Sequence, residues 1–122
     1  MKVIETTNAP GAIGPYSQGY EINGFLYTSG QIPVNPVTGM IPEGIAAQAD
    51  QSCQNVGAIL KAGGSSFEKV FKTTCFLADM NDFAAFNEVY ATYFVSKPAR
   101  SCVAVKTLPK GVLCEIEVIA AK

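Results

Sequence analysis

Arg100 is the only arginine of the chain, and all the other basic residues are lysines. It follows Pro98-Ala99 and lies inside a segment whose composition is typical of a β-strand, an unusual place for a charged side chain. A guanidinium presents a planar fork of N–H donors that binds a carboxylate through two hydrogen bonds, which an ammonium cannot do. The position therefore predicts a carboxylate-binding site. The structural alternative is an ion pair with Glu115 or Glu117.

Residue alternation along the last two expected strands, 99–106 and 112–121, divides their side chains between two faces of a sheet. The apolar residues of the last strand indicate a helix-covered side, and Glu115 points to the other side. We expect Arg100 to face away from the helices as well. In a direct hairpin, Glu115 would lie roughly 13 Å from the position opposite Arg100. Three possibilities follow: the strands are not neighbours, Arg100 meets an acid of another chain, or both residues reach a ligand between them.

The chain contains no histidine. A Ser-His-Asp or Cys-His catalytic arrangement is therefore excluded, and so are His-ligated metal sites and the usual general base near neutral pH. The net charge is −1, the isoelectric point is about 5.3, and no basic run occurs. These values argue against electrostatic binding of nucleic acid. We expect neither a metal nor a cofactor.

The four cysteines have none of the spacings of zinc sites. We interpret them as free thiols, with disulfides as the alternative, and Cys53, Cys75 and Cys114 as core residues, which fits a reducing cytoplasm. The first residues lack the apolar core of a signal peptide, and no apolar run approaches the roughly 20 residues that span a bilayer. We therefore expect a soluble cytoplasmic protein without a membrane partner.

The length of 122 residues predicts a single domain, residues 1–122. Asn23-Gly24 predicts a type I′ hairpin turn, because both of its central residues need a positive φ. The expected elements are a short strand at 3–5, hairpin strands at 18–22 and 25–29, a helix at 45–62, a strand at 69–78, a second helix capped by Asp79 and ending near Phe94, and strands at 99–106 and 112–121. Phe83, Phe86, Tyr90 and Tyr93 form the expected buried face of the second helix.

This order of elements predicts an α+β fold, with a single mixed six-stranded sheet and two helices on one face. Two helices cannot cover both faces of such a sheet. We therefore expect other subunits to cover the second face, in a closed cyclic assembly.

Four segments together resemble the Rid family, also called YjgF-type proteins, and in particular its enamine/imine deaminases. The segments are Gly14-Pro15-Tyr16-Ser17-Gln18-Gly19, Thr28-Ser29-Gly30-Gln31-Ile32-Pro33, Ala62-Gly63-Gly64-Ser65 with the residues from Val70 onward, and Pro98-Ala99-Arg100-Ser101-Cys102-Val103 followed by Glu115-Ile116-Glu117. The segment from Met80 to Tyr90, which includes Asn87, is also similar. The resemblance covers nearly the whole chain.

The resemblance implies a chorismate-mutase-like α+β fold and a homotrimer with a ligand site in each cleft between subunits. It implies hydrolysis of 2-aminoacrylate and 2-iminobutanoate to the 2-oxo acid and ammonia, without a cofactor.

The resemblance also implies roles for individual residues. Arg100 would bind the substrate carboxylate and Glu115 would hold the attacking water. The residues that it implies for substrate binding are Tyr16, Ser29, Gly30, Asn87 and Cys102, the last through its backbone. Each has a structural alternative: Glu115 as a counter-ion of Arg100, Tyr16 as loop packing, and Ser29-Gly30 as the turn after the hairpin.

Two other functions compete with the deaminase. One is a non-catalytic binder or sensor of small 2-oxo acids or amino acids, which would use Arg100 without Glu115 chemistry. The other is a ribonuclease or translation inhibitor, activities credited to some members of the family. The acidic isoelectric point and the missing histidine argue against the latter.

Overall fold

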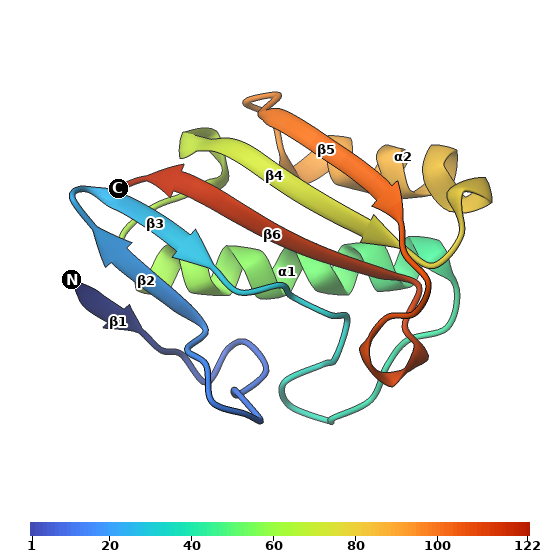
Figure 1. Ribbon diagram of the computed structural model, residues 1–122, viewed down its shortest axis with the longest axis horizontal. Helices are drawn as coiled ribbons and strands as arrows, with labels where there is room; N and C mark the ends of the chain where they lie inside the picture. The colour runs from blue at the N-terminus through green and yellow to red at the C-terminus, as the bar shows by residue number, and fades with distance from the viewer.

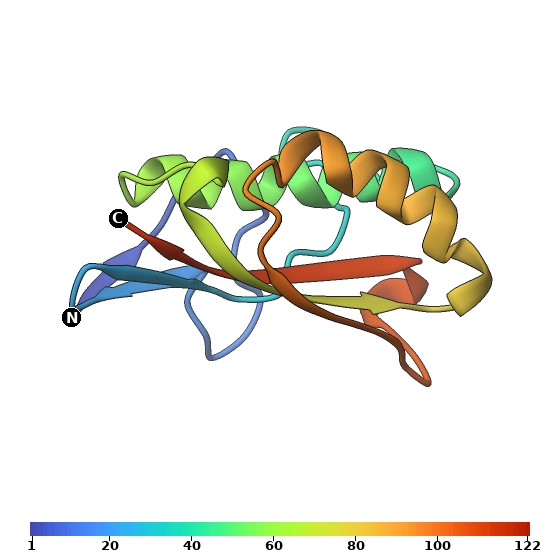
Figure 2. The same ribbon diagram turned by 90° about the horizontal axis from the view of Figure 1, so that it is seen from above.

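Six strands form one mixed sheet, and the computed structural model describes residues 1–122. The strands are β1 (Lys2–Ile4), β2 (Gly19–Ile22), β3 (Phe25–Thr28), β4 (Val70–Leu77), β5 (Ala99–Ala104) and β6 (Cys114–Ala121), and the helices are α1 (Ile45–Ala62) and α2 (Phe83–Tyr93). The strand order is β1-β2-β3-β6-β4-β5. Both helices lie on one face of the sheet (Figure 1, Figure 2). The predicted α+β architecture is therefore confirmed.

Local sequence signals set several element boundaries. Asn23 and Gly24 have φ values of 52° and 81°, as the predicted type I′ turn requires. Helix α1 begins and ends at the predicted residues, and the backbone N–H of Gly63 bonds to its last carbonyls. The predicted cap of the second helix is wrong in detail. Asp79 accepts a hydrogen bond from the N–H of Asn81 and caps a separate 3₁₀ turn, so α2 begins only after that turn.

Strand β5 lies at the edge of the sheet and runs parallel to β4, which separates it from β6. The first of the three possibilities for Arg100 and Glu115 is thus confirmed, since their strands are not neighbours. In the β4–β5 register Arg100 lies beside Thr73. Thr73 is fully buried under the helices and pairs with the buried Val118 of β6. Arg100 therefore faces the helices, and the expectation that it faces away from them is wrong.

The reason for this difference lies in the pairing. Alternation decides which residues of one strand share a face, but the pairing of strands decides how the faces of two strands correspond. With β4 between them, β5 and β6 are matched through Thr73, which lies beside Arg100 on one side and Val118 on the other. On β6, buried residues alternate with less buried ones, and Glu115 lies between the buried Cys114 and Ile116. Its side chain therefore points to the face without helices.

Buried polar side chains of α1 hold the long loop at residues 31–44. The Asn55 amide donates to the carbonyls of Ile32 and Val34, both at 3.0 Å. Gln48 donates to a carbonyl at the far end of the same loop. Because the loop starts directly after Gly30, these contacts fix the chain beside one of the candidate site residues.

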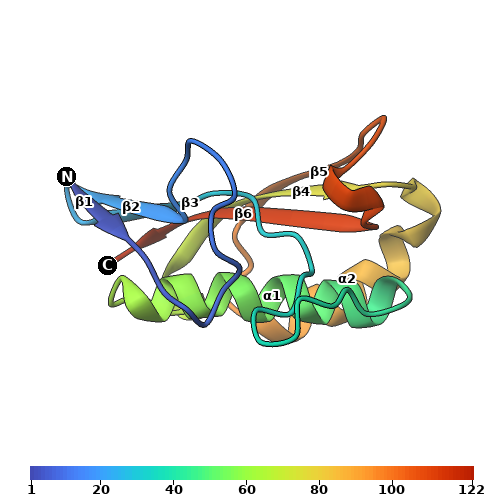
Figure 3. The same cartoon turned by 90° about the horizontal axis from the view of Figure 1, so that it is seen from below.

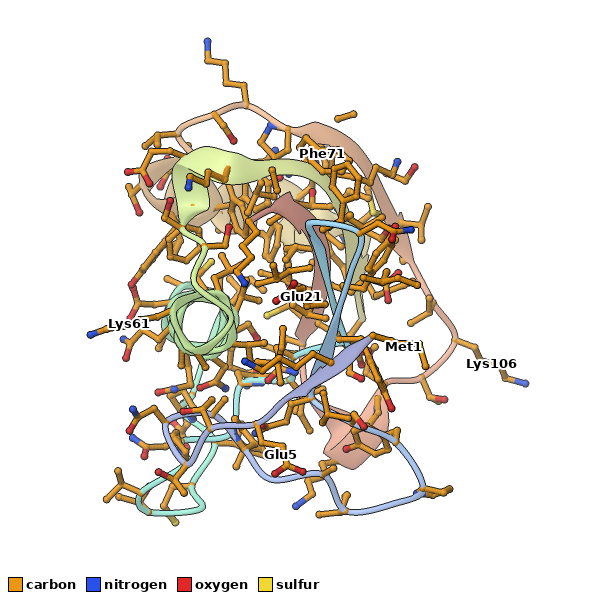
Figure 4. The ribbon with its side chains drawn as sticks, turned by 90° about the vertical axis from the view of Figure 1, so that its left-hand side faces the viewer. Met1, Glu5, Glu21, Lys61, Phe71 and Lys106 are labelled. Carbon is orange, nitrogen blue, oxygen red and sulfur yellow. The ribbon has the colours of Figure 1, made fainter.

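Neither helix covers the opposite face of the sheet (Figure 2, Figure 3). Its large apolar residues with more than a third of their surface exposed are Val3, Tyr20, Ile22, Phe25, Tyr27, Phe71 and Val103. The segment between β1 and β2 and the segment after β5 both rise from this face (Figure 3). Figure 4 shows Lys106, in the second of these segments, on the side of the sheet away from α1. Neither helix has the length and apolarity to cross a membrane.

We predict that Asn55→Leu lowers the free energy of unfolding by about 2 kcal/mol, because two part-buried carbonyls lose their buried amide donor. Urea unfolding at fixed protein concentration measures the change. Asn81→Ala, at an exposed position, serves as the control and should change stability by less than about 0.5 kcal/mol. An equally small effect at Asn55 would contradict this assignment.

Candidate active site

The Arg100 side chain packs against α2. Its Nη1 donates to Oδ1 of Asn87 at 2.8 Å. Its guanidinium carbon lies 4.7 Å from the ring centroid of Tyr90 and 5.4 Å from that of Phe83. The single ion pair of the chain involves other residues, so no carboxylate of the same chain neutralises Arg100. The structural alternative of an ion pair with Glu115 or Glu117 is therefore wrong within one chain.

This environment leaves the guanidinium able to bind an anion. Aromatic faces attract a cation through the ring quadrupole and do not use its N–H donors. Of the five N–H donors, the one bonded to Asn87 is engaged. A cavity of about 310 Å³ opens at this edge of the sheet, lined by Asn87, Tyr90, Ala91, Lys97, Pro98 and Arg100. The Arg100 fork therefore remains free for a carboxylate from outside the chain.

Cys102 lies two residues after Arg100 on the same face and beside Cys75 of β4. Burial raises the pKa of the Cys102 thiol, and the Arg100 charge opposes this only in part. The thiol is therefore protonated at neutral pH and is a poor nucleophile. All four cysteines are free, and the other three are buried in the core as predicted.

Glu115 lies on the other face of the sheet, against Gly30. Gln31 and Ile116 exchange backbone hydrogen bonds, which brings Gly30 beside Glu115. A Cβ atom at Gly30 would overlap the Glu115 carboxylate and lie 2.7 Å from its Cδ. Gly30 therefore gives this carboxylate the room to fold over the backbone, which the alternative interpretation of Ser29-Gly30 as a turn does not explain.

The carboxylate of Glu115 is partly withdrawn from water and has no cation partner in its own chain. Burial raises the pKa of Glu115, and the neighbouring Glu117 raises it further. A carboxylate with a raised pKa is a stronger base once ionised, which suits it to accept a proton from water.

Ser29 and Tyr16 lie on the same side of the molecule as Gly30. The Ser29 hydroxyl donates to the carbonyl of Ser17 at 2.6 Å, so it holds the loop that follows β1. Tyr16 is half exposed at the end of that loop. With Gly30 it lines a cavity of about 210 Å³ between the loop and residues 31–39.

The seven predicted site residues thus form two groups. Arg100 and Cys102 of β5 lie under α2 on the helix face, together with Asn87 of α2 itself, whereas Glu115, Gly30, Ser29 and Tyr16 lie on or beside the open face. A side chain cannot pass through a hydrogen-bonded sheet. One molecule therefore cannot touch Arg100 and Glu115 of the same chain across β4.

Three residues that contact Arg100 or the loop leading to Tyr16 were not predicted to do so. Phe83 and Tyr90 were assigned to the buried face of the second helix, but their rings also contact Arg100. They lie four residues before and three residues after Asn87, so all three share one face of α2, and this spacing was available in the sequence. The third is Gln18, whose buried amide makes four hydrogen bonds to the backbone at residues 6–10.

Comparison with known proteins gives a consistent result. Residues 6–122 match the model of the family described as Endoribonuclease L-PSP. The chain is 52% identical to the 2-iminobutanoate/2-iminopropanoate deaminase of Escherichia coli, over 99% of this chain and 98% of the relative. It is 53% identical to the putative regulator AldR of Lactococcus lactis, over 98% of this chain and 97% of the relative.

A solved structure of Escherichia coli TdcF with bound serine superposes on the fold with a TM-score of 0.96 and 51% identity, covering 100% of this chain and 99% of that one. The family match spans nearly the whole chain, as the resemblance of the four sequence segments predicted. The chain belongs to the Endoribonuclease L-PSP family, which is the YjgF-type or Rid family.

Proposed function

We propose that the protein hydrolyses small 2-imino acids and their enamine tautomers, such as 2-iminobutanoate and 2-aminoacrylate, to the 2-oxo acid and ammonia. One observation carries this proposal: an arginine fork without an anion and a glutamate of raised pKa without a cation, on opposite faces of one sheet. The names of the relatives, among them the Escherichia coli deaminase, support the reaction.

The site proposed here needs two copies of the chain. Arg100 of one subunit and Glu115 of its neighbour would face the same cleft, which removes the obstacle of the intervening sheet. The open face, with exposed Phe25, Tyr27 and Phe71, offers apolar surface for subunit contact. We propose a homotrimer, because in a closed cyclic arrangement every cleft between two copies receives Arg100 from one copy and Glu115 from the other.

In the proposed mechanism, Arg100 binds the substrate carboxylate through two hydrogen bonds, and backbone N–H groups near Gly30 and Cys102 complete its binding. Glu115 orients a water molecule and accepts its proton as the water oxygen bonds to the imine carbon. Glu115 then returns this proton to the nitrogen. As the C–N bond breaks and ammonia leaves, the same carboxylate takes the remaining hydroxyl proton and the C=O bond of the 2-oxo acid forms. Such positioning supplies several kcal/mol, and a single general base adds about 10²–10⁴-fold.

The reaction needs no cofactor, because a protonated imine is already electrophilic. The assignment of the protein to the cytoplasm is likewise part of the proposal, and the four free thiols support it.

A second candidate is a binder or sensor of small amino acids or 2-oxo acids. Two relatives favour it: the putative regulator AldR and the structure of TdcF with bound serine. This function uses the Arg100 fork and leaves Glu115 without a chemical role. The two candidates therefore differ in what the loss of the Glu115 charge does.

We expect Arg100→Ala to lower kcat/KM for 2-iminobutanoate by about 100-fold or more, because two charge-assisted hydrogen bonds are lost. Arg100→Lys should recover only part of this loss, since an ammonium keeps the charge but lacks the fork. The assay couples a threonine dehydratase to detection of the 2-oxo acid. Lys61→Ala, on the outer side of α1 (Figure 4), is the charge-matched control. Unchanged turnover in Arg100→Ala would refute the role of the fork.

Glu115→Gln should reduce kcat by about 10²-fold or more, since the amide cannot accept the proton. The affinity for 2-oxobutanoate, measured by calorimetry, should change by less than about threefold, because the fork is intact. A protein that keeps this affinity and shows no deaminase activity even as wild type would be the sensor instead.

The pH profile should report the raised pKa of Glu115. The base acts as a carboxylate, so activity is lost as pH falls through this pKa, at a higher pH than an ordinary glutamate would give. Glu117→Gln removes the neighbouring negative charge that helps to raise the pKa of Glu115. Its acid limb should therefore move to lower pH while activity persists. If the acid limb of Glu117→Gln lies at the same pH as that of the wild type, a group other than Glu115 controls it.

A further inference from the structure

The Arg100 side chain lies on the helix face of the sheet without a counter-ion, so contacts other than an ion pair must hold it in place. Its aliphatic chain is flexible, and the bond to Asn87 restrains one nitrogen. A carboxylate would hold it more strongly but would occupy the fork and cancel its charge. The rings of Phe83 and Tyr90 contact the guanidinium without using its N–H donors.

Of the two rings, that of Tyr90 is the closer to the guanidinium and the better anchored. Tyr90 is 8% exposed, whereas Phe83 is only partly buried. The Tyr90 ring stacks on Phe94, with centroids 4.3 Å apart and planes 22° apart. Its hydroxyl shares a 2.7 Å hydrogen bond with the hydroxyl of the fully buried Thr73.

Thr73 is the residue that lies directly beside Arg100 in the β4–β5 register. The contacts therefore close a ring: the Arg100 backbone pairs beside Thr73, Thr73 bonds to Tyr90, and Tyr90 lies against the Arg100 guanidinium. A closed set of contacts fixes the distance between the guanidinium and its own strand. A buried tyrosine hydroxyl needs a hydrogen-bond partner, and here that partner is the strand neighbour of Arg100.

We propose that Tyr90, anchored by Thr73, is a positioning residue that holds the Arg100 fork in its carboxylate-binding orientation. The inference rests on the proposed function, since it concerns the same carboxylate site. Burial also raises the pKa of Tyr90, so the phenol stays neutral at physiological pH and acts through its ring face and its hydroxyl.

The test uses the fact that Arg100 is the only arginine, so its Nε–H gives a single side-chain NMR signal. In the wild type this signal should be displaced by the ring current and should relax as a rigid group. It should become mobile in Tyr90→Phe, which keeps the ring and loses the hydroxyl, and should approach the shift of a free arginine in Tyr90→Leu. Thr73→Val should mimic Tyr90→Phe, and the double variant should add little to either single change.

Binding gives a second measurement. Tyr90→Phe should weaken 2-oxobutanoate binding by about 3- to 10-fold and raise KM by the same factor, while kcat changes by less than about twofold. Binding of the neutral analogue 2-oxobutanamide should not change, because no anion meets the fork. If Tyr90 only supported the fold, Tyr90→Phe would change the affinities for both ligands together or would change neither.

Tyr93→Phe is the matched control. Tyr93 is also on α2, and its hydroxyl donates a 2.6 Å hydrogen bond to Asp50, away from Arg100. If Tyr93→Phe mobilises the Arg100 signal as much as Tyr90→Phe, or if Tyr90→Phe leaves both the signal and the 2-oxobutanoate affinity unchanged, the proposal is wrong. A wild type that does not bind 2-oxobutanoate would refute the proposed function, and the NMR signal would still decide the role of Tyr90.

Discussion

A hydrogen-bonded sheet separates the two charged groups on which the proposed chemistry depends. Arg100 lies under α2, and Glu115 lies against Gly30 on the other face. Were they in direct contact within one chain, the opposite charges would pair and neutralise each other before a substrate could bind. Because the strands keep them apart, each remains an unsatisfied half-site at the surface of the fold.

Each half-site is held by neutral groups. Asn87 and two aromatic rings hold Arg100, while the Gly30 backbone accommodates Glu115. Neutral supports leave the positive charge and the raised carboxylate pKa intact, whereas an ion pair would remove both. This arrangement suits a reaction in which the substrate itself contains the electrophilic carbon, as a protonated imine does. A chain without histidine can then use one cation for orientation and one carboxylate for proton transfer.

The hairpin at Asn23-Gly24 and the bounds of α1 were predictable, because a turn dipeptide and a helical stripe ended by glycines are local signals. The face of Arg100 was not, because it depends on the insertion of β4 between β5 and β6, a non-local pairing. The site residues were found through a family resemblance, and their division into two groups required the structure. The ring contacts of Tyr90 were within reach of the sequence, but an aromatic residue on an apolar helix face is more simply interpreted as core.

Complementation between subunits tests the central claim most directly. Arg100→Ala and Glu115→Gln should each be inactive as homo-oligomers. If every site takes its arginine from one copy and its glutamate from the next, random mixing of the two variants restores about a quarter of the sites. Co-expression or refolding of an equimolar mixture should therefore recover about a quarter of wild-type deaminase activity. No recovery from verified mixed oligomers would show that both residues act within one chain and would contradict the account.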